Sequence, residues 1–226
     1  MNGLEVLSAR SQRNNIYGVV IGIVTNNKDP DGLGRVKIIL PWLSENEESA
    51  WARVAVPMAG PDMGFYSLPE VDDEVLVAFE HGQVAYPYIV GALWNGKQKP
   101  PTANTDGKNN QRLIKSRSGH TILLDDTPGE EKIIVRDQSG KNEIEIDSKT
   151  NVITIKAGQD LKIEAQGNID LNSSKDVSII CNNFKVKAQQ NCEIKANLQA
   201  KLEASAGMNL TCMAGVKINN GALEIT

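Results

Sequence analysis

The second half of the chain places a pair of apolar residues, two positions apart, once in every eight residues. The register slips by one residue only once, between Val177 and Phe184. All eighteen slots are apolar although apolar residues make up 40% of the chain, so the period is not a chance pattern. The pairs are Ile153 with Ile155, Leu161 with Ile163, Ile169 with Leu171, Val177 with Ile179, Phe184 with Val186, Cys192 with Ile194, Ala200 with Leu202, Met208 with Leu210, and Val216 with Ile218.

The positions around these slots follow the same eight-residue rule. Residues between and just after the two slots are almost all polar, as in Lys162/Glu164 and Lys185/Lys187, with Ile180 as the clear exception. Each octad therefore predicts one short strand with a polar face and an apolar face, followed by a turn. Two positions after each of the first eight pairs comes a small residue: Ala157, Ala165, Ser173, Cys181, Ala188, Ala196, Ala204 and Cys212, and Asn220 follows the ninth pair.

The apolar face of the octads needs a cover that this half of the chain does not offer. No helical period and no second sheet accompany the repeat, and burying each large aliphatic side chain is worth about 1.5–3 kcal/mol. We therefore expect three copies to intertwine into a β-helical needle over residues 152–226. The trimer core would hold every slot except Cys192 and Ala200. The alternative is a monomeric β-helix with three octads per coil, whose three coils would have two open ends.

Proline and aromatic residues divide the chain into two parts. All nine prolines lie at or before Pro128, and nine of the ten aromatic residues lie at or before Trp94. A long stretch without proline is typical of a backbone whose N–H groups all bond to neighbouring strands. We expect a linker at residues 96–115, which begin with a segment rich in Pro, Gly and Asn, and a neck at residues 116–151.

The first half predicts short strands separated by turns. About five strands occur without a helical period, which fits a small barrel of the OB type over residues 16–95. The fold class is therefore all-β, an N-terminal OB barrel followed by an intertwined trimeric β-helix of octad repeats. The expected strands span residues 17–24, 35–40, 51–56, 74–79 and 88–93.

Charge and targeting signals exclude several classes of function. Residues 1–100 carry 8 Lys and Arg against 12 Asp and Glu, and residues 101–226 carry 16 of each. Neither half has the positive excess that binding to nucleic acid requires. The first fifteen residues have no basic segment followed by an apolar core, so we expect synthesis in the cytoplasm without a secretory signal.

Candidate sites for chemistry each have a structural explanation. Two carboxylates in Asp29-Pro-Asp31-Gly could hold a metal, but the later ligands of a calcium loop are missing and a turn accounts for them. His120 lies near Ser118 and Asp125 in sequence, but catalysis would need these groups to converge in a cleft. The cysteines occupy repeat slots and are expected to act as small buried hydrophobes. We therefore expect no enzyme activity, metal or cofactor.

Several short motifs resemble one family. Asp29 to Lys37 (DPDGLGRVK) resembles the "DP…GRV" turn of phage baseplate-assembly spikes and the related VgrG spikes of type VI secretion. The segments WARVAVP (51–57), VDDEVLV (71–77) and YIVGALWNG (88–96) are similar to the OB domain of that family, in the same order. KSRSGHTI (115–122) and DDTPG (125–129) are similar to its neck.

The resemblance implies the central spike of a contractile injection apparatus: a phage tail, a tailocin or a phage-derived bacterial system. Such a spike is a homotrimer that sits on a baseplate hub and pierces the target membrane mechanically. We expect residues 1–15 to contact the hub and a PAAR-type tip protein to bind Ala222, Leu223, Glu224, Ile225 and Thr226. The protein would be made in the cytoplasm and assembled into the particle. A trimeric β-helical fibre that degrades glycans or mediates adhesion is the alternative.

Overall fold

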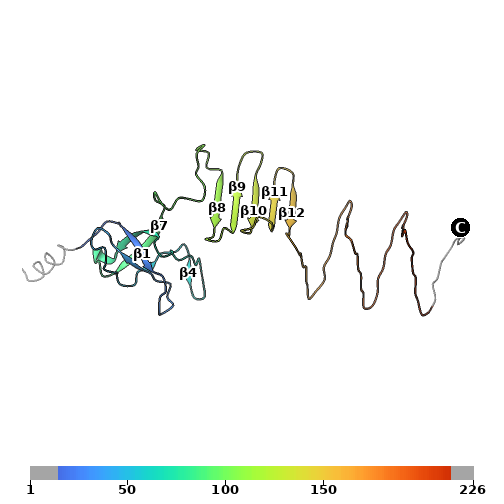
Figure 1. Cartoon of the computed structure of the whole chain (residues 1–226), viewed down its shortest axis with the longest axis horizontal. Coiled ribbons are helices and arrows are strands. Elements are labelled where there is room, and N and C mark those ends of the chain that lie inside the picture. Colours follow the sequence, from blue (N-terminus) through green and yellow to red (C-terminus); the bar gives the residue numbers. More distant parts are fainter. Residues whose placement is uncertain (1–14, 215–226) are drawn as a thin grey trace, which may run out of the picture. The chain divides into compact units, whose positions relative to one another are not determined.

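A computed structural model describes residues 15–214 (Figure 1). The chain forms two compact units, Met1–Ile163 and Glu164–Thr226. The regular elements in the described part are strands and one 3-10 turn, η2 (Glu80–Gly82). No helix in this part is long and apolar enough to span a bilayer. The strands are β1 (Val20–Asn26), β2 (Lys37–Ile39), β3 (Arg53–Val54), β4 (Ala59–Gly60), β5 (Met63–Gly64), β6 (Glu74–Phe79), β7 (Pro87–Leu93), β8 (Gln111–Lys115), β9 (Thr121–Asp125), β10 (Lys132–Arg136), β11 (Glu143–Asp147) and β12 (Val152–Lys156).

Five strands of the first half form one sheet in the order β2-β1-β6-β7-β3. All neighbours are antiparallel except β3 and β7, which are parallel. The two edges of this sheet meet where Val36 and Ala52 exchange backbone hydrogen bonds of 3.0 and 2.7 Å. This bridge closes the sheet into a five-stranded barrel with the strand order of the OB fold, which confirms the predicted fold class of the first half.

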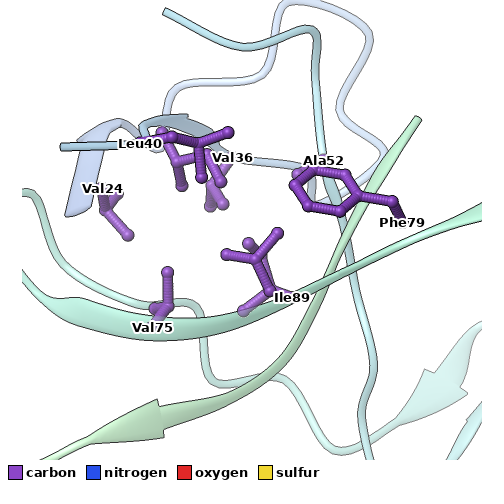
Figure 2. Packing of buried hydrophobic residues seen from close by; sticks show 9 residues of the cluster. Val24, Val36, Leu40, Ala52, Val75, Phe79 and Ile89 are labelled. Carbon is purple, nitrogen blue, oxygen red and sulfur yellow. The ribbon is translucent and has the colours of Figure 1, made fainter. Parts of the chain in front are cut away.

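The barrel interior is filled by one cluster of aliphatic side chains and Phe79. Alternation explains the cluster: in β6 every second residue is buried, and Val75 and Val77 have no exposed surface. Figure 2 shows labelled side chains of this cluster pointing toward one another inside the barrel. Burial of each large side chain contributes about 1.5–3 kcal/mol. The cluster consists of Val24, Val36, Ile38, Leu40, Ala52, Val75, Val77, Phe79 and Ile89.

Gly22 shows why one position in β1 carries no side chain. A Cβ at this position would lie 3.0 Å from both Ile38 Cδ1 and Val77 Cγ2, which is closer than side chains normally approach. Glycine therefore lets β1 lie against the core without displacing its neighbours.

A second sheet, which we call the neck sheet, consists of β8 to β12 in simple antiparallel order. Figure 1 shows its five strands side by side. The sheet covers residues 111–156, so β8 begins inside the range expected to be a linker and β12 contains the first apolar pair of the octads, Ile153 and Ile155. The Asn110 carbonyl accepts from the Asp126 N–H at 2.8 Å, which fastens the start of β8 to the turn after β9.

The described octads after β12 are extended segments joined by bends. The bends end at positions 159, 167, 175, 182, 190, 198, 206 and 214, so seven residues separate 175 from 182 and eight separate the others. The short step falls where the apolar pairs slip by one residue. The chain therefore turns with the period that the sequence predicts. No strand forms among residues 157–214, and every residue from Ile155 to Ala214 is exposed.

Candidate assembly interface

One face of the neck sheet consists almost entirely of exposed aliphatic side chains. Strand register aligns them in two rows that cross all five strands, Arg112–Leu124–Ile133–Ile146–Ile153 and Ile114–Ile122–Val135–Ile144–Ile155. We call these ten residues the dry face. Its nine aliphatic side chains are between 38% and 69% exposed. A contiguous patch of exposed aliphatic side chains is typical of a surface that another protein covers.

Arg112 is the one charged member of the dry face. Its guanidinium forms an ion pair with Asp126, which follows β9. The charge at this corner of the face is therefore balanced within the chain, and the remaining rows present only aliphatic groups.

The opposite face of the neck sheet carries ion pairs between neighbouring strands. Glu143 is 6% exposed and accepts from Arg136 Nε at 2.5 Å and from Lys156 Nζ at 3.0 Å. Lys132 Nζ lies 3.5 Å from Glu145 and 3.8 Å from Asp147. Between these charged rows the same face carries Leu113, Leu123 and Ile134, which are buried or half-buried. The two faces thus differ in that one has cross-strand ion pairs around a partly covered aliphatic row, and the other has exposed aliphatic rows.

The Lys156 ammonium and then the Arg136 guanidinium hold the pKa of Glu143 below its usual value of 4.5. A lowered pKa means that the carboxylate stabilises the folded sheet above pH 4.5 and loses this effect as the pH falls through its folded-state pKa. We expect Glu143→Gln to lower the melting temperature by about 5 °C at pH 7. Circular dichroism should show this difference shrinking toward pH 3. Glu130→Gln, in the exposed turn before β10, is the control; an equal loss at both positions would contradict the role of Glu143.

The predicted trimer-core residues of the octads are not buried in the single chain. Their exposed fractions run from 50% for Met208 to 82% for Ile194. This differs from a monomeric β-helix, in which the chain would bury its own stripe. The physical reason is that the described octads are extended segments that do not pair with one another. The exposed residues of the predicted core are Ile153, Ile155, Leu161, Ile163, Ile169, Leu171, Val177, Ile179, Phe184, Val186, Ile194, Leu202, Met208 and Leu210.

The cysteines are exposed in the single chain as well, although the sequence predicts them to be small buried hydrophobes. This holds for Cys181, Cys192 and Cys212 alike. The single chain therefore gives the apolar stripe no cover between Ile155 and Ala214, and its burial in a trimer stays a prediction. Val216, Ile218 and the predicted tip contacts Ala222 to Thr226 lie outside the described residues, as do positions 1–14 of the predicted hub contact.

The sequence prediction missed the dry-face residues that precede the octads. The octad period does not extend to these side chains, because the pairs in the neck are spaced by eleven and nine residues rather than eight. The signal was present: each neck strand from β9 on repeats two apolar residues two positions apart. The missed residues are Ile114, Ile122, Leu124, Ile133, Val135, Ile144 and Ile146.

The structure does not bring the alternative catalytic residues together. Asp125 lies at the far end of β9 from His120, and its carboxylate accepts from the Thr127 hydroxyl at 2.5 Å. His120 Nδ1 accepts from the Gln138 N–H at 3.2 Å, while the Ser118 hydroxyl lies 3.2 Å from that of Ser116. His120, Ser118 and Asp125 therefore form no relay.

The Asp29 carboxylate, a candidate metal ligand from the sequence, accepts hydrogen bonds from residues of its own turn instead. It accepts from the backbone N–H groups of Asp31, Leu33 and Arg35 at 3.1–3.2 Å, and from the Arg35 guanidinium at 2.8 and 2.7 Å. The Arg35 guanidinium holds the pKa of Asp29 well below its usual range. Among residues 15–214, no group of three or more His, Cys, Asp or Glu side chains is placed to hold a metal ion.

The barrel is similar to a domain of known proteins. Residues 20–94 match the type VI secretion system/phage-baseplate injector OB domain. The chain is 34% identical over 116 residues to the type VI secretion system spike protein VgrG3 of Vibrio cholerae, a match that covers 48% of this chain and 11% of that protein. It is 29% identical over 147 residues to the spike protein VgrG1a of Pseudomonas aeruginosa, covering 59% and 23%.

A third relative is the actin cross-linking toxin VgrG1 of Vibrio cholerae, 32% identical over 121 residues that cover 50% of this chain and 10% of the toxin. The matches thus span between a tenth and a quarter of the length of these relatives. They confirm the predicted resemblance to VgrG-like baseplate spikes. Residues 20–94 thus match an OB domain of the type VI secretion system/phage-baseplate injector, within a chain that is similar to VgrG spike proteins.

Proposed function

We propose that this chain is the central spike of a contractile injection apparatus and acts as a homotrimer without catalytic chemistry. The main support is the apolar stripe between Ile153 and Leu210, which the single chain leaves exposed. Two further copies of the same stripe would cover it, because three octads at one level can form the sides of a narrow triangular prism. The OB domain family and the two relatives named as spike proteins support the same assignment.

The proposed function is mechanical. Contraction of a sheath would drive the spike through the target envelope, and interlocked strands would carry the compressive load. The repeat contributes nine levels and strands β8 to β11 contribute four more. At about 4.7 Å per strand, the shaft would be on the order of 60 Å long.

The proposed partners follow from the same resemblance. A baseplate hub would hold the OB end, and a PAAR-type tip protein would bind the C-terminal end through Ala222 to Thr226. The target membrane would be a transient partner. The chain would be made in the cytoplasm and assembled into the particle, and its net charge of −4 supports neither nucleic acid nor anionic lipid as a resident ligand.

Light scattering after size-exclusion chromatography tests the trimer directly. One chain has a mass of 24.6 kDa, so we expect a single species of about three times that mass. A well-folded monomer in dilute solution would overturn the proposed function.

The proposed role in injection has its own test in the producing cell. Deletion of the chain should abolish delivery into target cells, and purified particles should contain it together with sheath and tube. If the purified chain instead depolymerises a surface glycan and is absent from such particles, the fibre alternative holds.

A further inference from the structure

We propose that three copies first meet through the dry face of the neck sheet, and that the octads join afterwards in order from β12 toward the C-terminus. This inference rests on the proposed trimer and specifies which of its surfaces forms it. The dry face and the octad stripe differ in one physical respect, which is whether the backbone is already ordered before a partner arrives.

The neck sheet satisfies its own backbone. Each of its strands pairs over five residues with a neighbour in the same chain, from β8 through to β12. The turns are fixed locally as well: Gly119, Gly129 and Gly140 adopt positive φ, and the Asp137 carboxylate accepts from Ser139 and Asn142. The nine aliphatic side chains of the dry face are therefore held in two straight rows without any partner.

The octads lack this support within one chain. Among residues 159–214, no backbone–backbone hydrogen bond joins one segment to another, and all side chains are exposed. Docking an octad onto a partner must order about eight residues of backbone, while it buries only two large side chains. A first encounter through the octads is therefore less favourable than one through a preformed sheet.

Docking of three neck sheets would lower the entropic cost of ordering the octads. Ile153 and Ile155 belong both to the last strand of the dry face and to the first octad. Once β12 is packed, the next pair, Leu161 and Ile163, is tethered close to its partners at high effective concentration. Each octad that joins then positions the following one, so the shaft closes in chain order.

A second copy of this chain is the occupant that the dry face fits best. The charge of Arg112 is balanced by Asp126 of its own chain, so the partner must offer an apolar surface without a complementary acid. The face of another copy does so over the same five strands, and the octad pairs follow it in the sequence. A three-fold arrangement uses the same patch in every copy, as closed symmetry requires.

Three variants of the full chain test the order of assembly. Ile122→Asp puts a carboxylate into the middle of the dry face, and Thr121→Asp puts the same group on the opposite face of β9 beside Lys115 and Arg136. Leu171→Asp puts it into the third octad. Light scattering gives the mass, tryptophan fluorescence shows whether the barrel is folded, and trypsin followed by mass spectrometry maps the exposed part of the shaft.

We expect Ile122→Asp to be a monomer with a folded barrel and Thr121→Asp to be a trimer. Leu171→Asp should remain a trimer, but trypsin should cut it at Lys175 and beyond at least about ten times faster than wild type. A trimeric Ile122→Asp, or a monomeric Leu171→Asp, would overturn the neck-first order while leaving the trimer itself intact. A monomeric wild-type protein would instead contradict the proposed function.

Discussion

Replacing Ile89 with aspartate is expected to unfold the OB barrel. Ile89 is 1% exposed and lies in the cluster that fills the barrel interior, where a carboxylate would find no cation or hydrogen-bond donor. Placing an unpaired charge there costs more than about 4 kcal/mol, which is a large part of the stability of a small domain. Urea denaturation followed by tryptophan fluorescence should therefore lose its cooperative transition, since Trp42, Trp51 and Trp94 all lie in the first half.

Val90→Asp is the matched control for this substitution. Val90 is the next residue of β7, is 49% exposed and falls at the bulge where the register between β6 and β7 shifts. The same carboxylate would remain in water there, so we expect a change in the free energy of unfolding within about 1 kcal/mol. If Ile89→Asp and Val90→Asp unfolded at the same urea concentration, the inward orientation of Ile89 would be wrong.

Strands with strict alternation could be predicted closely from the sequence. The prediction for residues 74–79 coincides with β6, because every second side chain enters the core. The prediction for residues 51–56 was longer than β3, because Ala52 makes an isolated bridge to Val36 and only Arg53 and Val54 pair with β7. The ribbon of β4 and β5 was not predicted. Its strands have two residues each, too few to show a period, and are joined by a turn in which Asp62 adopts positive φ.

The sequence predicted the octad part of the candidate interface but not the dry face of the neck sheet. The reason is the length of the turns between strands. A fixed spacing reveals a repeat when every strand is followed by the same turn, as in the octads. The neck strands carry the same pair of slots, but Ile122/Leu124, Ile133/Val135 and Ile144/Ile146 follow one another at a spacing of eleven residues. The next pair, Ile153/Ile155, follows after nine residues, because the turn before β12 is shorter. The dry face became recognisable only when strand register aligned these pairs. The eight-residue period of the sequence therefore predicts the apolar stripe of the octads. The apolar residues of the neck sheet can be identified only from the pairing of its strands.

The thiol groups of the assembled protein are expected to react at least about 100 times more slowly than those of the unfolded chain. Cys181, Cys192 and Cys212 are all exposed in the single chain, where a thiol reagent would reach each of them. All three occupy slots on the apolar side of the repeat, so the proposed trimer would enclose them. Modification by a chromogenic disulfide, with and without guanidinium chloride, measures the difference.

Two single-cysteine variants measure thiol protection in one octad of the shaft. With the other cysteines changed to serine, one variant keeps Cys192 and the other carries Glu193→Cys, the adjacent residue on the opposite side of the strand. In the trimer Cys192 should be protected, whereas the thiol at position 193 should react at the rate of a free cysteine, because only the apolar side faces the other chains. Protection at Cys192 should disappear in the Ile122→Asp background, which we expect to be monomeric. Equal, fast reaction at both positions in the wild-type background would mean that no second copy covers the apolar stripe.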